Sequence, residues 1–178
     1  RVLFRSTTAL FQAVTNELDV VYPTNVTAGF SQHVLCGFLA SQKLFRGSAH
    51  NCFRSRLGST SHLRLRAPSE YPSLWPRWFP HDGPNIADAR ASEATLQHIR
   101  QTFRAVTGRF ARPLVIKNLA TIQILDAVSD ALPDAKFIAI VRDPRRTMHS
   151  MWHARRSLGT LPDEFLGSDR KSTRLNSS

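Results

Sequence analysis

An arginine at the end of an apolar run and a serine eight residues later form the most specific chemical pattern in the sequence. Arg142 follows the run 136–141, and Ser150 lies beyond Asp143 and Pro144, which favour the start of a helix. A guanidinium makes forked, charge-assisted hydrogen bonds to phosphate oxygens, and a hydroxyl can donate one more. We therefore predict that Arg142 and Ser150 bind one phosphate group, the alternative being a solvated basic turn.

Two adjacent hydroxyl residues, Thr7 and Thr8, open a segment whose apolar residues have helical spacing. Hydroxyl groups and free backbone amides at the start of a helix can hold a phosphate or sulfonate oxygen. An ordinary helix cap is the other interpretation, and capping is what such residues usually do. By itself this segment therefore predicts the start of a helix, and it is compatible with an anion site without predicting one.

The elements that must position these residues alternate between helix and strand. Periodicity predicts helices over 7–18, 26–44 with an interruption at Gly37, 91–106, 122–132 and 144–157. Short apolar runs predict strands over 20–22, 114–117 and 136–141. This alternation is typical of a parallel α/β sheet, in which ligands bind beyond the carboxyl ends of the strands.

A proline-rich segment, residues 46–90, separates the two halves of this pattern. It contains Ser, Gly and Arg together with the cluster Tyr71, Trp75, Trp78 and Phe79. Such a composition predicts an irregular insertion rather than sheet elements. The aromatic cluster either forms a small core of the insertion or bounds an acceptor pocket.

Three stretches resemble the sulfotransferases that use 3′-phosphoadenosine 5′-phosphosulfate as donor. They are Thr-Thr-Ala-Leu-Phe-Gln from residue 7, Pro-Leu-Val-Ile-Lys-Asn over 113–118, and Leu-Pro-Asp-Ala-Lys-Phe-Ile-Ala-Ile-Val-Arg-Asp-Pro-Arg from residue 132. The resemblance spans most of residues 7–168. It implies a P-loop-like parallel α/β sheet flanked by helices, and transfer of a sulfonate group to a hydroxyl or amine acceptor. The acceptor would be a small molecule or a glycan.

The resemblance also implies roles for individual residues. Arg142 and Ser150 match the pair that binds the 3′-phosphate, and Thr7 and Thr8 match the end of the 5′-phosphosulfate loop. Lys117 matches a lysine near the leaving oxygens of the donor, although a strand-end lysine reaching water is an equal alternative.

The catalytic base is not assigned by these matches. Cytosolic relatives place a histidine two residues beyond the lysine, where this chain has Leu119. No triad or paired-carboxylate spacing selects another residue. The remaining candidates are Glu17, Glu70, His33, His50, His62, His81, His98, His149 and His153.

Both ends of the chain match translated laboratory DNA. Residues 169–178 read as the translation of a common sequencing adapter, and residues 1–6 as that of the same DNA's reverse complement. Because two unrelated ends match one DNA strand and its complement, we set both apart from the fold. We expect residues 7–168 to be a partial domain, truncated at both ends, with most of the phosphosulfate loop upstream.

Composition excludes several classes of protein. The 178 residues are 42% hydrophobic and 21% charged, which excludes a disordered chain, and no apolar run is long enough to span a membrane. Two cysteines form no disulfide scaffold and no zinc spacing, so we expect no metal and a cytoplasmic location. The net charge of +11 falls to +7 when residues 1–6 and 169–178 are set apart, because five cations and one carboxylate lie in them. The remaining positive charge suits an anionic ligand, but no motif for reading nucleic acid accompanies it. The oligomeric state stays open.

Two other functions remain as alternatives to sulfonate transfer. A P-loop nucleotide or sugar kinase would need a Gly-x-x-x-x-Gly-Lys-Ser/Thr loop and a carboxylate for its metal, and neither is present. A non-catalytic fragment is the other alternative.

Overall fold

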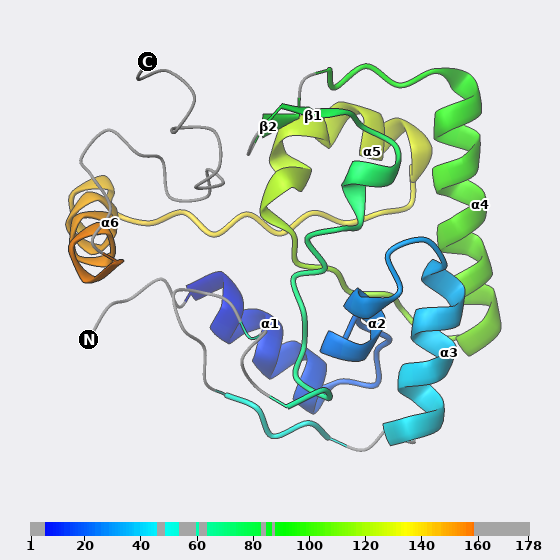
Figure 1. The fold of residues 1–178 in the computed structure, drawn as a ribbon, viewed down its shortest axis with the longest axis horizontal. Coiled ribbons are helices and arrows are strands. Elements are labelled where there is room, and N and C mark those ends of the chain that lie inside the picture. The colour runs from blue at the N-terminus through cyan, green and yellow to red at the C-terminus, as the bar shows by residue number, and fades with distance from the viewer. Residues whose placement is uncertain are drawn as a thin grey trace, which may run out of the picture.

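The computed structural model of the protein describes residues 6–45, 49–53, 60, 64–82, 85–86 and 88–158 (Figure 1). Its α-helices are α1 (Ser6–Glu17), α2 (Asn25–Gly29), α3 (Val34–Phe45), α4 (Glu93–Phe110), α5 (Leu125–Ala131) and α6 (Pro144–Leu158). Two 3-10 helices, η1 (Trp75–Arg77) and η2 (Leu119–Ile124), accompany them. A short antiparallel hairpin pairs β1 (His81–Asp82) with β2 (Asn85–Ile86).

The hydrophobic core lies among α3, α4, α5 and the aromatic segment around η1. Trp75 stacks on Phe103 of α4 with ring centroids 6.0 Å apart, and its Nε1 donates to Thr121 Oγ1 at 2.9 Å. Tyr71 and Phe79 are fully buried in the same cluster. The aromatic residues are therefore part of the main core rather than a separate core of an insertion, and Trp75 also lines a pocket with Arg100 and Phe103.

Three helix predictions agree with the structure and two differ, the first being 122–132, which is the 3-10 helix η2 as far as Ile124 and α5 only from Leu125. The predicted helix over 7–18 is α1, that over 91–106 is α4, and that over 144–157 is α6. Asp143 starts α6 as expected, because its Oδ1 accepts a hydrogen bond from the backbone N–H of Arg145 at 2.8 Å. The segment 26–44, however, breaks between α2 and α3 rather than at Gly37.

Gly37 is needed because α2 and α3 pack very closely. A Cβ atom at this position would lie 2.9 Å from the Thr27 carbonyl oxygen and 3.0 Å from Phe30 Cβ. Both neighbours are fixed by the backbone of the preceding helix and turn, so they cannot move aside without a shift of α2 against α3. The glycine therefore allows α2 and α3 to pack closely, and it does not interrupt a helix.

We expect Gly37→Ala to destabilise the protein by about 1–3 kcal/mol, the usual cost of overpacking. Urea denaturation followed by circular dichroism measures this free energy of unfolding. Gly108→Ala is the matched control, because Gly108 lies in α4 with nothing within 4 Å of its Cβ position. That control should gain about 0.5–1 kcal/mol from the better helix propensity of alanine. Equal effects of the two substitutions would rule out the close-contact explanation.

A single bridge represents the predicted parallel sheet within the described residues. Val21 and Leu114 form a parallel bridge, in which Val21 N–H donates to Pro113 O and Val115 N–H donates to Val21 O, each at 2.8 Å. These residues belong to two of the predicted strands. The P-loop-like α/β architecture is therefore not observed in the described part of the chain.

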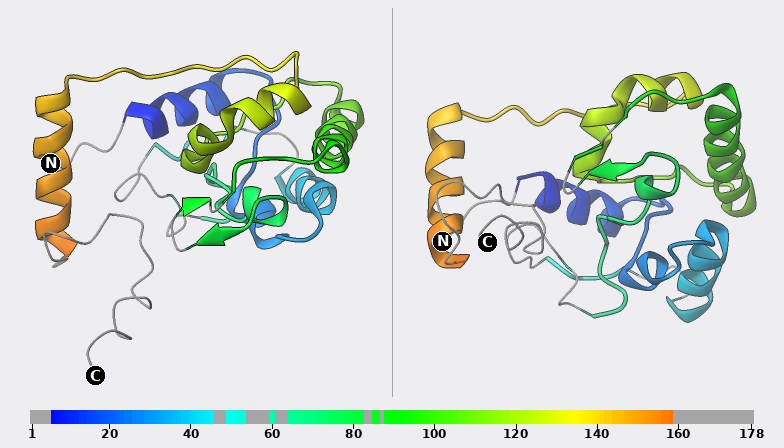
Figure 2. Two further views of the ribbon diagram at one scale, coloured as in Figure 1. Left: turned by 90° about the horizontal axis from the view of Figure 1, so that it is seen from above. Right: turned by 45° about the horizontal axis from the view of Figure 1, so that its top comes forward.

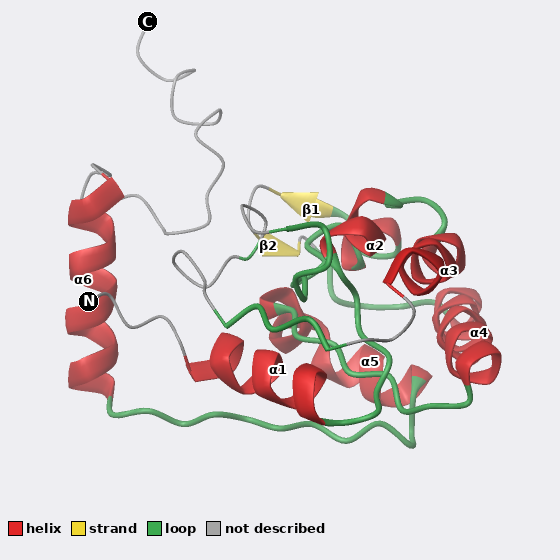
Figure 3. Cartoon of the chain, turned by 90° about the horizontal axis from the view of Figure 1, so that it is seen from below, coloured by secondary structure: helices red, strands yellow, loops and turns green. Residues whose placement is uncertain are grey.

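The strongest predicted strand, residues 136–141, does not form a strand. It runs as an extended connection from α5 to α6 (Figure 3). Ile138 is 78% exposed and Val141 91% exposed, although this run has the pattern of a strand buried on both faces. A strand needs a neighbour to accept and donate its backbone hydrogen bonds. No such neighbour pairs with this segment among the described residues.

Helix α6 lies apart from the other helices at the end of this connection (Figure 1). In both views of Figure 2 the amino end of α1 is the end nearer to α6. The two segments predicted to bind the donor therefore lie on the same side of the molecule.

Candidate functional site

Two of the predicted site residues come together although they are far apart in the sequence. Lys117 Nζ donates a hydrogen bond to Thr8 Oγ1 at 3.0 Å, and it forms an ion pair with the carboxylate of Glu70. The exposed fractions of the Lys117 and Glu70 side chains are 12% and 25%. Thr8 is buried, and the neighbouring Thr7 is exposed. The structure thus forms a three-residue cluster of the Lys117 cation, the Glu70 carboxylate and the hydroxyl of Thr8, which lies in the first turn of α1.

The lysine segment is held on both sides of Lys117. Before it, Val115 N–H donates to Val21 O in the parallel bridge. After it, Asn118 Oδ1 accepts from Ala120 N–H at 2.9 Å and caps η2, while its Nδ2 donates to Tyr71 O at 2.9 Å. The second of these contacts joins the lysine segment directly to the residue that follows Glu70.

The glutamate segment is anchored to the loop that precedes α2. Ser69 N–H donates to Pro23 O at 2.8 Å, and Asn25 N–H donates to Ala67 O at 3.0 Å. The same loop begins at Val21, which bridges to the lysine segment. One loop therefore sets the positions of both charged residues in the cluster.

Tyr71 fixes the direction in which the chain leaves Glu70. Its φ of 50° is in the left-handed region, which costs a non-glycine residue of order 1–2 kcal/mol. Full burial and a hydrogen bond from its hydroxyl to Phe30 O at 3.0 Å hold this conformation. Burial also raises the pKa of Tyr71, so the hydroxyl stays a neutral donor.

The cluster has the groups that transfer of an anionic group requires. The Lys117 ammonium and the amino end of α1 both favour negative charge at the same place. In the structure that charge is the carboxylate of Glu70, which is also a possible acceptor for a proton. An anion bound by Lys117 and Thr8 would lie close to a carboxylate able to deprotonate a second reactant.

Arg142 and Ser150, the predicted pair for a phosphate, lie just before α6 and within it. Arg142 is half-buried at the end of the extended connection. Ser150 is buried in α6, and its Oγ has no hydrogen-bond partner among the described residues. A buried hydroxyl without a partner is costly unless a ligand satisfies it. That both side chains bind one phosphate stays a prediction.

The structure distinguishes among the candidate bases. His50 is buried with both ring nitrogens engaged: Nδ1 accepts from Cys52 N–H at 2.8 Å, and Nε2 lies 3.1 Å from Gln12 O. Its burial lowers the pKa of the imidazole, which keeps it neutral and structural. His98 Nδ1 accepts from Trp78 Nε1 at 3.2 Å. His62 and the side chain of His81 lie outside the described residues.

Glu70 is the functional candidate that sequence reasoning did not select. It was one of nine possible bases, and no spacing connected it with Lys117. The only local signal for a buried position was that Glu70 lies between Ser69 and Tyr71, in a segment rich in aromatic residues. The connection between residues 70 and 117 arises from tertiary contacts, which the one-dimensional pattern does not contain.

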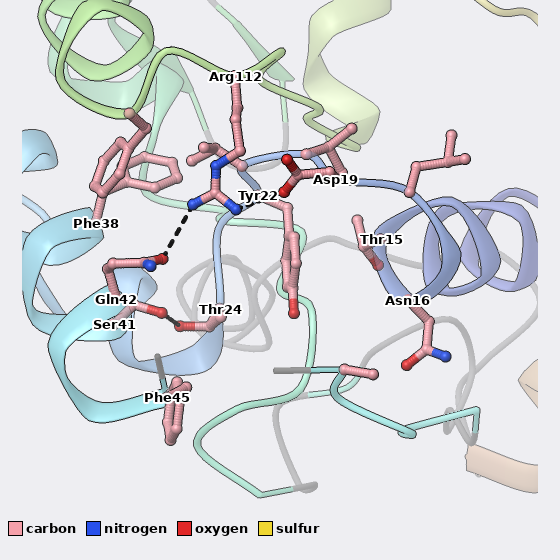
Figure 4. A pocket seen from close by; sticks show the side chains of 15 residues that line it. Thr15, Asn16, Asp19, Tyr22, Thr24, Phe38, Ser41, Gln42, Phe45 and Arg112 are labelled. Carbon is pink, nitrogen blue, oxygen red and sulfur yellow. Dashed lines mark hydrogen bonds and ion pairs between the residues drawn. The ribbon is translucent and has the colours of Figure 1, made fainter. Parts of the chain in front are cut away.

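A pocket between α1 and α3 contains none of the candidate site residues named above (Figure 4). Its volume is about 80 Å³, and several of its polar groups pair with one another. Arg112 donates to Asp19 Oδ1 at 2.7 Å and to Gln42 Oε1 at 3.4 Å, and Thr24 Oγ1 lies 2.8 Å from Ser41 Oγ. We interpret this pocket as a structural feature that connects α1, α3 and the end of α4.

Within residues 6–158 as far as they are described, no three His, Cys, Asp or Glu side chains gather closely enough to hold a metal ion. None of the described helices combines the length and the apolar character needed to cross a bilayer.

Comparison with known proteins identifies a family. Residues 31–174 match the model of a family described as the sulfotransferase family. The match includes Glu70, Lys117, Arg142 and Ser150 but begins after α1, so Thr7 and Thr8 lie outside it. It also extends over residues 169–174, and the origin proposed for both chain ends stays a prediction. No curated protein and no solved structure matches the chain.

Proposed function

The chain belongs to the sulfotransferase family, and we propose that it transfers a sulfonate group from 3′-phosphoadenosine 5′-phosphosulfate to a hydroxyl or amine of a small-molecule or glycan acceptor. In this reaction a bond forms between the acceptor's oxygen or nitrogen and the sulfur. The bond from sulfur to the phosphate oxygen breaks, and its electron pair leaves with that oxygen. The acceptor's proton passes to a base.

The observation that carries this proposal is the cluster of Thr8, Glu70 and Lys117. The lysine and the amino end of α1 would stabilise the charge that develops on the leaving phosphate oxygen. Glu70 would accept the acceptor's proton, a role of general base. Because Glu70 pairs with Lys117 in the structure, an incoming donor anion would compete for the lysine and release the carboxylate.

Arg142 and Ser150 fit the other end of the donor. A guanidinium matches phosphate geometry, and a phosphate oxygen would satisfy Ser150 Oγ, which has no hydrogen-bond partner in the part of the chain that the structure describes. When bound, the donor supplies an activated sulfonate with a phosphate leaving group. We also propose a cytoplasmic location on the basis of the free thiols of Cys36 and Cys52.

Donor binding tests the proposal without knowledge of the acceptor. We expect the unmodified chain to bind 3′,5′-diphosphoadenosine and Arg142→Ala to weaken this binding by about 10- to 150-fold. The expected loss corresponds to one charge-assisted hydrogen bond, which contributes about 1.5–3 kcal/mol. Isothermal titration calorimetry measures both affinities. Arg145→Ala, an exposed neighbour in α6, is the matched control and should bind normally.

Two results would reject this assignment. Unchanged binding by a folded Arg142→Ala protein would remove Arg142 from the donor site. Binding of ATP in preference to 3′,5′-diphosphoadenosine by the unmodified chain would favour a kinase-like phosphotransferase instead.

A further inference from the structure

Two histidines lie one helical turn apart on the surface of α6 and face each other. His149 and His153 are both exposed, and their Nε2 atoms are 3.2 Å apart. Their ring centroids are 4.4 Å apart, and the ring planes cross at 71°. Residues four apart on a helix share a face, so this proximity follows from the helix itself.

The separation of the two nitrogens fits a shared metal ion. Nitrogen ligands lie about 2.0–2.1 Å from Zn²⁺, so two of them in tetrahedral geometry are about 3.3–3.4 Å apart. In the tetragonal geometry that Cu²⁺ prefers, adjacent nitrogens at similar bond lengths are about 2.8–3.0 Å apart. The observed 3.2 Å lies between these two values. Only a small rotation of the rings is needed to place both lone pairs on one ion.

We propose that His149 and His153 bind a divalent transition-metal ion, Cu²⁺ more tightly than Zn²⁺, with water in the remaining positions. The order follows the general preference of nitrogen sites among divalent metals. In the metal-free pair one Nε2–H donates to the other Nε2. On binding, the donating ring changes to its Nδ1–H tautomer, so that both rings offer a lone pair and no proton is lost.

The other described histidines do not offer such a pair. Both ring nitrogens of His50 are engaged with the backbone, and His98 Nδ1 is occupied by Trp78. His33 is exposed but lies at the start of α3, away from α6. The site is therefore defined by the spacing on α6 and not by histidine content.

The charge on α6 opposes metal binding and gives the site a recognisable property. Arg145 and Arg146 lie one turn before His149, and Arg156 lies over the ring of Trp152 at 5.0 Å. These guanidinium groups repel a divalent cation through solvent, and salt screens that repulsion. Affinity for the metal should therefore rise with added NaCl, whereas binding to a carboxylate cluster would weaken.

Titration of Cu²⁺ into the full chain tests the site, with tryptophan fluorescence as the signal. The Trp152 ring centroid is 5.1 Å from that of His153, so bound Cu²⁺ should quench Trp152, and Trp152→Phe should remove most of the quenching. His149→Ala and His153→Ala should each weaken binding by at least about tenfold, equivalent to about 1.4 kcal/mol.

A relocated pair is the matched control. Met151→His with His153→Ala keeps the number of histidines but places the two rings about 200° apart around the helix. This variant should bind as weakly as the single-alanine variants. Electron paramagnetic resonance of the Cu²⁺ complex should show two nitrogen ligands in the unmodified chain. Equal affinity of the unmodified and relocated chains, or a spectrum without two imidazole nitrogens, would overturn the proposal.

Discussion

Replacing Lys117 with methionine is expected to lower kcat for sulfonate transfer by about 10²–10³-fold, the usual loss when one preorganised stabiliser of developing charge is removed. Lys117 is the cation in contact with both Thr8 and Glu70, and its side chain is only 12% exposed. Water cannot easily replace it. The measurement is the rate of 3′,5′-diphosphoadenosine release with saturating donor and a panel of hydroxyl and amine acceptors.

This substitution also removes the partner of a partly buried carboxylate, so stability must be separated from chemistry. Loss of one member of a fully buried pair costs about 3–5 kcal/mol, and less is expected here because Glu70 is 25% exposed. The double variant Lys117→Met with Glu70→Gln should recover stability but not activity. Lys43→Met, at an exposed lysine in the last turn of α3, should change neither. Full activity of a folded Lys117→Met protein would exclude the proposed role.

The sequence was most informative about residues whose role depends on local structure. Thr8 follows a helix start that hydroxyl residues favour, and Asp143 starts α6 through a hydrogen bond within its own turn. Both features depend on neighbours within about four residues. Local signals of this kind are present in the sequence itself, and the structure confirms the helices that they start.

The strand predicted over 136–141 shows that a pattern of apolar residues is not enough to predict a sheet. Its apolar residues match a buried strand, but a strand forms only where another segment completes its hydrogen bonds. Val21 and Leu114 form one parallel bridge, whereas Ile138 is exposed. The family match supports a P-loop-like fold, but the partner that residues 136–141 require is not among the described residues.

The charged cluster could be predicted only in part for the same reason. The resemblance placed Lys117 and Thr8 near one donor, and the structure places them 3.0 Å apart. Glu70 enters the cluster through a segment that is anchored by hydrogen bonds to Pro23 and Asn25. Neither contact has a signature in the spacing of the residues, so the carboxylate was indistinguishable from Glu17.

Glu70→Gln provides the sharpest separation of binding from chemistry. Loss of a general base lowers kcat by about 10²–10⁴-fold, because the acceptor keeps its proton as the new bond forms. Glutamine preserves the shape of the side chain but has no negative charge to compete for Lys117. The affinity for donor should therefore stay the same or increase, whereas Lys117→Met should lose affinity and kcat together. Calorimetry with 3′,5′-diphosphoadenosine and steady-state rates measure the two quantities separately.

Glu17→Gln is the matched control for this prediction. Glu17 is a candidate of the same chemical type, but it is exposed at the end of α1 and accepts a hydrogen bond only from the neighbouring Asn16 in the contacts observed. We expect its removal to leave kcat and donor affinity unchanged. If Glu70→Gln lowered donor affinity as much as kcat, the carboxylate would hold the site together rather than accept a proton. If it left kcat unchanged, the base would have to come from a different side chain, and the cluster would retain only its cation.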